Sequence, residues 1–407
     1  MSRLKRLANS AEWKKNNDYS LQLSRWFLIS IGAWPQTCTS NIIERLSTIV
    51  LVPIWSFIVA IYTVPCLLYI FFEAKGIQMK LNSLGPLVHR LMGSFIYWIL
   101  LTYGKAIQEC IKHMEQDWRI VQRIEDTEVM MKHAKIGRYI TIVCAILMQS
   151  SVFLLNIRTV LITVTLNHNN VTTTTRVLSC PTYRKLIDAR FSPVNEIMIS
   201  MQFISSYITG SCIVCICSLA IVFAMHACGQ LNMLSAWFNE FNEDNTKENY
   251  VAERRLAAIV KHHLRVLCFI ERIENIMYKG CFVQLVGCTL NLCVVGNCFV
   301  MNWSILTKSR MFTTATICAS MAFNIFIFCY IGEIITEQCT KVGRIAYMSN
   351  WYKLNYKTAR GFILIIARSN NIIKITAGKI FHLSITMFGD IVKTSLAYVN
   401  LLKALSM

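Results

Sequence analysis

Charged residues are scarce in this sequence. Only 15% of its 407 residues are charged and 55% are apolar, whereas a soluble domain carries about 25% charged residues. Several uncharged stretches are roughly 20 residues or longer, the length at which an apolar helix crosses a bilayer. The scarcity of charge therefore excludes an ordinary soluble protein and predicts a multi-pass protein that lies in the lipid bilayer.

Sequence motifs of catalysis and of metal binding are missing as well. We find no G-x-x-x-x-G-K-[ST] phosphate loop, no H-E-x-x-H, no G-x-S-x-G and no EF-hand loop. The adjacent His262 and His263 point to different faces of a helix. Ten of the 17 cysteines fall in apolar runs, where cysteine is usually a small packing residue. We expect neither an enzyme nor a cofactor.

Seven segments are apolar enough to span a membrane. They are residues 46–72, 84–103, 139–157 with a continuation past Arg158, part of 197–239, 280–307, 311–332 and 380–402. The second is the weakest, because His89 and Arg90 lie near its outer end, where a long side chain can reach the interface. The seventh contains Asp390 and Lys393, which either pair with each other or lie along a water-filled path. Its polarity predicts that it faces protein or water rather than lipid.

Basic residues are distributed unevenly between the loops of this topology. Of 41 Lys and Arg, 29 fall in the amino-terminal segment and in loops 104–138, 225–280 and 333–379, 9 fall on the other side and 3 inside spans. Positive charge concentrates in cytosolic loops, and the first 45 residues lack a signal peptide pattern. We therefore expect a cytosolic amino terminus, an extracellular carboxyl terminus and no nucleic-acid partner. A glycosylation sequon at Asn170 falls in a loop expected to be outside.

Two of the predicted cytosolic loops carry apolar residues at helical spacing. One stripe runs from Leu256 to Met277 and continues into the fifth span, and the other runs from Ile107 to Val121. An amphipathic helix needs something to cover its apolar face. The two alternatives are packing of these stripes within the chain and contact with another subunit.

Short motifs resemble those of the insect odorant receptor family. Gly32-Ala33-Trp34-Pro35 resembles the G-x-W-P element before the first span. The last quarter resembles the family in order and spacing through Tyr330, Gly332-Glu333, Ala346-Tyr347, Asn350-Trp351-Tyr352, Ile366-Ala367-Arg368-Ser369 and residues Ser395 to Leu402. Ala397-Tyr398 is not followed by the Gln-Phe of gustatory receptors, which favours the odorant branch. The second cytosolic loop is shorter than that of the shared co-receptor, which favours a tuning subunit.

The resemblance implies an all-α membrane protein that forms a ligand-gated, non-selective cation channel in a hetero-tetramer with a co-receptor, in the plasma membrane of a sensory dendrite. It implies a cytosolic segment at 1–45, spans one to six at 46–332, a cytosolic anchor at 333–379 and a pore-lining span at 380–407. A small apolar odorant would bind among spans two, three, four and six. The candidate lining residues are Met92, Phe95, Phe153, Met201, Tyr207 and Met321. The resemblance places the pore gate at Leu401 and Leu405.

Three other classes of protein remain as alternatives. A gustatory-type channel differs in the last span, as described above. A G-protein-coupled receptor would have its amino terminus outside, and its late spans usually contain prolines, whereas all six prolines here lie between positions 35 and 193. A secondary transporter would show repeated halves with broken helices, and no internal repeat is visible.

Overall fold

The computed structural model describes residues 2–35, 42–121, 123–168, 171–243, 249–301, 308–349, 351–353, 355–370 and 374–406. The sequon at Asn170, a second sequon at Asn302-Trp303-Ser304 and the motif residue Asn350 lie outside these ranges. The helices are α1 (Ser2–Ser30), α2 (Ile42–Phe72), α3 (Ile77–Thr102), α4 (Gly104–Ile120), α5 (Ile124–Leu161), α6 (Val194–Glu243), α7 (Asn249–Met301), α8 (Lys308–Met348), α9 (Tyr356–Asn370) and α10 (Ile385–Ser406), with a 3-10 turn η1 (Trp351–Lys353). The strands are β1 (Thr163–His168), β2 (Val171–Arg176), β3 (Thr376–Ala377) and β4 (Phe381–His382).

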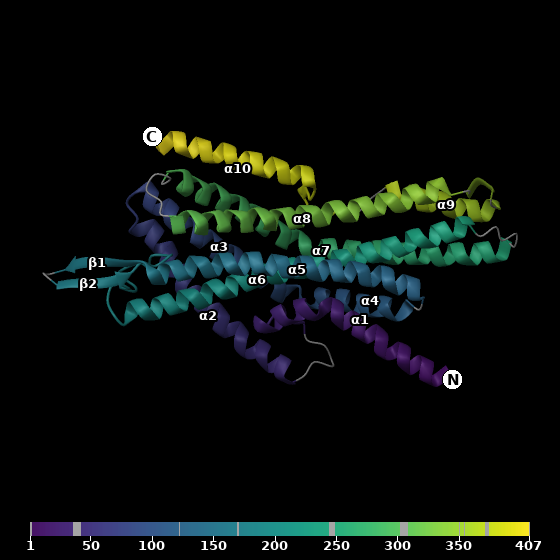
Figure 1. Ribbon diagram of the computed structural model, residues 1–407, viewed down its shortest axis with the longest axis horizontal. Coiled ribbons are helices and arrows are strands. Elements are labelled where there is room, and N and C mark those ends of the chain that lie inside the picture. Colours follow the sequence, from purple (N-terminus) through teal and green to yellow (C-terminus); the bar gives the residue numbers. More distant parts are fainter. Residues whose placement is uncertain are drawn as a thin grey trace.

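The long helices α5 to α8 run lengthwise through the molecule (Figure 1). The β1–β2 hairpin projects from one end, which we call the hairpin end, and α9 lies at the other, which we call the α9 end. β1 and β2 are antiparallel, with Thr163 opposite Arg176 and His168 opposite Val171. The sequence suggested only a threonine-rich loop here, although threonine and valine favour extended backbone.

Helix α6 forms the centre of the bundle. It packs against α5, α8, α7 and α3, and every residue from 208 to 231 is buried. A helix that is apolar on all sides is stable only when it is surrounded in this way. With 50 residues it is about 75 Å long, much longer than a bilayer core of about 30 Å. The fourth span, expected within residues 197–239, is therefore part of a helix that continues well beyond a bilayer core.

Six helices of the described part are long and apolar enough to cross a membrane: α2, α3, α5, α6, α7 and α8. They coincide with the six spans expected first. The helical fold predicted from the sequence is confirmed. The seventh predicted span begins later than expected, because residues 376–382 form the β3–β4 hairpin and α10 starts only at Ile385.

The β3–β4 hairpin and the start of α10 are attached to α7 and α8. The Gly378 N–H donates to the Tyr278 carbonyl at 2.9 Å, and Gly378 has a φ of +66°, which its missing side chain permits. The Glu333 carboxylate accepts a hydrogen bond from the Ile385 N–H at 3.2 Å. Ser384 caps the helix by accepting from the Met387 N–H. The Gly-Glu motif of α8 therefore fixes the position at which α10 begins.

Both amphipathic stripes are covered within the chain. Most apolar residues of the α7 stripe are buried, including Leu256 and Ile273, and Ile107 and Met114 of α4 belong to the same core cluster. Around α9, Phe362 packs against Phe238 of α6 with ring centroids 5.7 Å apart. Of the two alternatives, intramolecular packing therefore covers most of both stripes.

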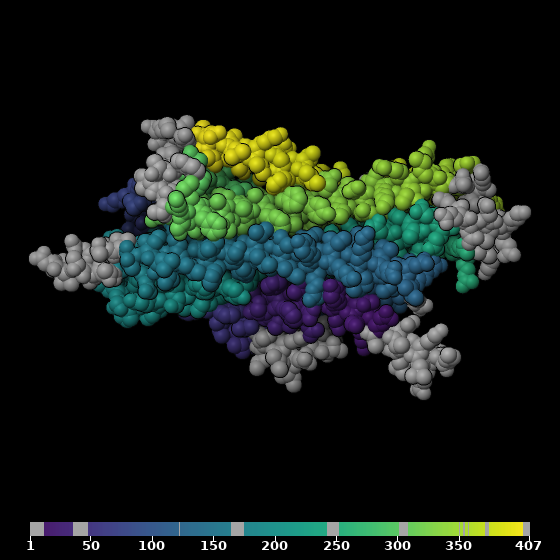
Figure 2. Space-filling view, viewed as in Figure 1, coloured from purple at the N-terminus to yellow at the C-terminus, as the bar shows by residue number. Residues whose placement is uncertain are grey.

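Helix α10 lies on the outside of the bundle, on α8 (Figure 2), and contacts α7 and α8. Val399 packs toward α7, because a Cβ at Gly296 would lie 3.0 Å from it. Asp390 and Lys393 are both described and exposed, and they form no ion pair with each other. This outcome removes the first of the two interpretations given to that pair.

Candidate ligand-binding site

A cavity of about 470 Å³ lies at the hairpin end, between α3, α5, α6, α7 and α8. Volumes of about 300–1,000 Å³ are typical of small-molecule sites. Its apolar lining includes Leu81, Pro86, Met92, Met148, Leu155, Ile213, Val294, Phe299, Ile317 and Met321. Its polar lining includes Asn82, His89, Arg90, Ser151, Arg158, Ser179, Ser206, Asn291, Arg310, Ser320 and Asn324. The site is therefore mixed in polarity rather than purely apolar.

Arg90 is the most deeply buried charge of this cavity, with 3% of its surface exposed. Its Nη1 donates to Cys180 Sγ at 2.7 Å and its Nη2 to Ser206 Oγ at 2.8 Å. The guanidinium lies 4.3 Å from the centroid of the Tyr62 ring, and the Tyr62 hydroxyl donates to the Cys180 carbonyl at 2.9 Å. Arg90 Nε is buried without a partner in the described part of the chain.

Cys180 supplies part of the charge compensation for Arg90. Burial by itself raises the pKa of the Cys180 thiol, but the neighbouring Cys66 thiol and the Arg90 guanidinium outweigh it and lower that pKa to about 7. A thiol is a weaker counter-group for a guanidinium than a carboxylate. Arg90 keeps a positive charge that its neighbours do not fully neutralise.

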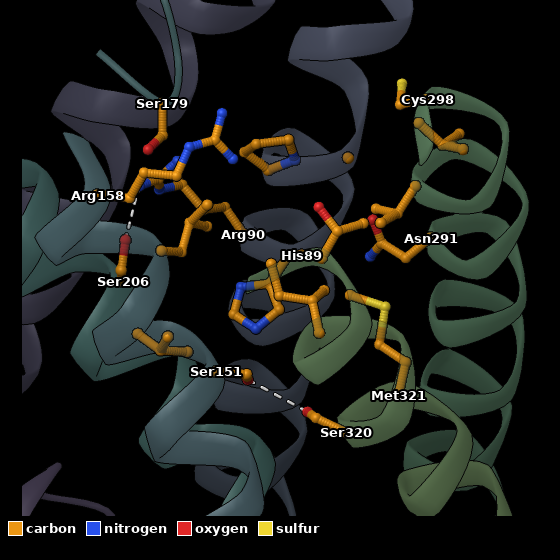
Figure 3. A pocket seen from close by; sticks show the side chains of 18 of the residues that line it. His89, Arg90, Ser151, Arg158, Ser179, Ser206, Asn291, Cys298, Ser320 and Met321 are labelled. Carbon is orange, nitrogen blue, oxygen red and sulfur yellow. Dashed lines mark hydrogen bonds between the residues drawn. The ribbon is translucent and has the colours of Figure 1, made fainter. Parts of the chain in front are cut away.

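Other polar side chains of the cavity differ in how well they are satisfied. Ser151 of α5 donates to Ser320 of α8 at 3.2 Å, a bond drawn in Figure 3. Asn291 of α7 is fully buried, yet neither its Oδ1 nor its Nδ2 has a hydrogen-bond partner among the described residues. A buried amide left without partners costs free energy, and at a cavity wall a ligand can supply them.

Five of the six predicted ligand-contact residues line three separate cavities, and the sixth lines none of them. Met92 of α3 and Met321 of α8 line the main cavity. Phe153 and Tyr207 line a separate hollow of about 270 Å³ between α5 and α6, and Phe95 lines a third of about 350 Å³ next to Trp98. Met201 is half-buried on α6 and lines none of these three cavities.

Sequence reasoning did not select the polar residues that surround the two methionines. Figure 3 shows Arg90 and Arg158 close together at one wall, near Ser179 and Ser206. A usable signal existed for both arginines, because charges inside predicted spans mark functional sites more often than lipid-facing ones. Ser179 and Asn291 carried no such signal, since their role depends on which helices meet.

The two predicted gate residues lie far along α10. Leu401 is 53% exposed, and it shares a helix face with Thr394 and Tyr398, which are also exposed. The side chain of Leu405 lies outside the described part of the chain. The face that carries Leu401 is therefore uncovered in the single chain.

Comparison with known proteins places the chain in a receptor family. A family model described as 7tm Odorant receptor matches residues 76–396. Odorant receptor 10 of Aedes albopictus is 22% identical over 219 residues, which are 53% of this chain and 57% of that protein. Odorant receptor 82a of Drosophila melanogaster is 29% identical over 151 residues, 37% of this chain and 38% of the relative. These matches thus cover about half of the curated relatives' length or less.

Solved structures of similar fold match over nearly the whole chain. The insect olfactory receptor OR5 from Machilis hrabei superposes with a TM-score of 0.74 at 14% identity, covering 95% of this chain and 99% of that one. The same receptor in complex with eugenol gives a TM-score of 0.73. Because the family model covers most of the sequence and the fold agrees from end to end, this chain belongs to the odorant receptor family of insects.

Proposed function

We propose that this chain is the odorant-binding tuning subunit of a ligand-gated, non-selective cation channel, assembled as a hetero-tetramer with a co-receptor in the plasma membrane. The observation that carries the proposal is the cavity of about 470 Å³ between five helices. A receptor of similar fold was solved with eugenol, which supports a small organic ligand. Met92 of α3 and Met321 of α8 would contact that ligand, because flexible thioethers adapt to varied shapes.

The proposed orientation puts the hairpin end outside the cell and the α9 end in the cytosol. Support comes from the 29 basic residues that the predicted topology gathers on one side, against 9 on the other. The segment 333–379 would then be a cytosolic anchor between subunits. Exposed aromatic residues at that end, such as Tyr347, Tyr352 and Tyr356, support a contact surface there.

The proposed pore is lined by α10. Its uncovered face carries Thr394, Tyr398 and Leu401, and a helix with polar residues on an uncovered face does not suit lipid. A ring of Leu401 side chains, with Leu405 one turn further along, would close a narrow pore by excluding water. Ligand binding would open it by a small dilation that lets water enter.

Whole-cell current recording tests this function directly. Cells that express the chain together with the co-receptor should give odorant-dependent cation currents. Cells that express either subunit alone should give no such current, or a current with a different ligand profile. Leu401→Ser should raise the ligand-independent current, whereas Leu396→Ser, an equally exposed leucine on a different face of α10, should not. A ligand profile that is unchanged by the presence of this chain would contradict the proposal.

A further inference from the structure

Three arginines line the cavity, and no acidic residue does. Arg90 comes from α3, Arg158 from the end of α5 and Arg310 from the start of α8. The side chains of Arg158 and Arg310 have no hydrogen-bond or ion-pair partner among the described residues. Separate segments of the chain therefore bring one buried arginine, Arg90, and two half-buried ones, Arg158 and Arg310, to one partly open cavity without a full counter-charge.

The carboxylates near the hairpin end are engaged or turned away. Glu73 pairs with Arg184, with Nε and Oε1 2.6 Å apart. Asp188 pairs with Arg190 at 2.7 Å, and Glu196 is exposed on the first turn of α6. Arg90 donates to Cys180 Sγ and Ser206 Oγ and to no carboxylate. The positive charge of the cavity is thus not cancelled from within the described chain.

An unmatched charge in a low-dielectric space is unfavourable unless a ligand supplies the opposite charge. Guanidinium groups present a planar fork of donors that fits an oxyanion, in particular a carboxylate. The buried Arg90 Nε and the unpartnered amide of Asn291 are further groups at the wall that lack partners. The apolar part of the lining, which includes Met321, Leu155 and Ile317, suits an aliphatic chain.

We infer that this cavity selects an oxyanion with an aliphatic tail, namely a medium-chain carboxylic acid bound as its carboxylate, rather than a neutral hydrocarbon. This inference rests on the proposed function, and it replaces the purely apolar ligand expected from the sequence. An alkyl carboxylic acid has a pKa close to the value of about 4.3 for a glutamate side chain, so it is ionised at neutral pH. Its charge would be neutralised by Arg158 and Arg310, while the tail occupies the methionine wall.

The test compares three eight-carbon ligands on the channel formed with the co-receptor: octanoic acid, methyl octanoate and 1-octanol. Octanoic acid should activate at the lowest concentration. Arg158→Gln and Arg310→Gln should each raise its half-maximal concentration about tenfold or more and leave the value for the ester within about threefold. Arg158→Lys should restore part of the response, because it keeps the charge but not the fork.

Lys185→Gln is the matched control. It removes a positive charge from the exposed loop at the same end, outside the cavity, so it should leave all three ligands unchanged. Arg90 is unsuited to the primary test because it also donates hydrogen bonds to Ser206 and Cys180. Its substitution would therefore change the packing as well as the charge. Ester and alcohol responses equal to that of the acid, with no effect of either arginine variant, would overturn the ligand class while leaving the channel function intact. Absence of current with every odorant class would instead contradict the proposed function.

A lipid phosphate is the other source of an oxyanion. Thermal unfolding of the purified complex in lipid-free detergent separates the two. Octanoate should raise the unfolding temperature of the unmodified protein and not that of the Arg158→Gln, Arg310→Gln double variant. The inference would be overturned if octanoate left the unfolding temperature unchanged while phosphatidic acid raised it in the unmodified protein and not in the double variant. That result would assign the cavity to a lipid headgroup.

Discussion

The two ends of the molecule pair their charged side chains in opposite ways. At the α9 end, Asp117 accepts a hydrogen bond from Arg265 Nε at 2.5 Å and lies 3.0 Å from His226 Nε2. At the hairpin end, Arg158 and Arg310 line a cavity without a partner among the described residues. A paired buried charge fixes how helices pack, whereas a half-buried charge without a partner at a cavity leaves interaction energy for a ligand. The difference separates a structural half from a binding half within one helical bundle.

The largest expected effect is the loss of Asp117. Asp117→Ala leaves Arg265 and His226 without their acceptor inside the bundle and should cost about 3–5 kcal/mol of unfolding free energy. Thermal unfolding of the purified receptor and its surface amount in cells measure this loss. Asp188→Ala, which breaks the half-exposed pair with Arg190, should cost less than about 1 kcal/mol. Equal losses for the two variants would remove the distinction between the two ends.

The second prediction concerns Asn291 at the cavity, where a substitution should affect ligand binding more than the free energy of unfolding. Asn291→Leu removes two polar atoms that have no partner, so unfolding stability should stay the same or rise. The half-maximal ligand concentration should change about tenfold if the ligand uses that amide. Asn232→Leu is the matched variant at the α9 end, where the amide lies 2.7 Å from His133 Nε2, and it should lower stability without changing ligand preference. The reverse pattern would contradict the assignment of the two halves.

The third prediction concerns pH and the α9 end. Burial lowers the pKa of His113 from 6.5 to about 4, despite the Asp117 carboxylate 3.5 Å away. As the pH falls, the unfolded chain takes up a proton on His113 at a higher pH than the folded chain does. The free energy of unfolding is therefore unaffected by His113 above pH 6.5 and decreases as the pH falls toward 4. At pH 5.5 the loss should be about 1 kcal/mol. Unfolding temperatures at pH 7.5 and 5.5 measure it, and His113→Phe should reduce the difference between them.

The smallest effect is expected from the separate hollow between α5 and α6. Phe153→Ala and Tyr207→Ala should change the half-maximal concentration of one odorant relative to another by about threefold at most. The reason is that these side chains do not line the main cavity. Met321→Ala, which does, should change it more. Concentration–response curves for an odorant panel give both values. A uniform weakening of every ligand would identify Phe153 and Tyr207 as packing or gating residues.

The six strongest spans were predictable because each depends on local composition alone. The uncharged run between Arg45 and Glu73 became α2, and the run around Cys215 became the buried α6. The late start of α10 was not predictable in this way. The predicted span began at Ile380, but contacts of Gly378 and Thr376 with α7 hold residues 376–382 as a hairpin.

Of the candidate site, the sequence supplied Met92 and Met321 but not what surrounds them. Arg90 and Arg158 were visible as charges inside predicted spans, and their meeting at one wall was not. Residues 90, 158 and 310 are far apart along the chain, and periodicity describes one helix face at a time. Which faces meet depends on packing between helices.

The sequence by itself determined that this protein is helical, that it has the composition of a membrane protein and which segments are its spans, since the transfer of apolar residues from water to lipid is a property of each segment alone. Only the tertiary structure decided where a ligand can bind and how polar the lining of that cavity is. A cavity and its charge balance are sums over residues from different helices, and the three arginines line one cavity only when α3, α5 and α8 are brought together.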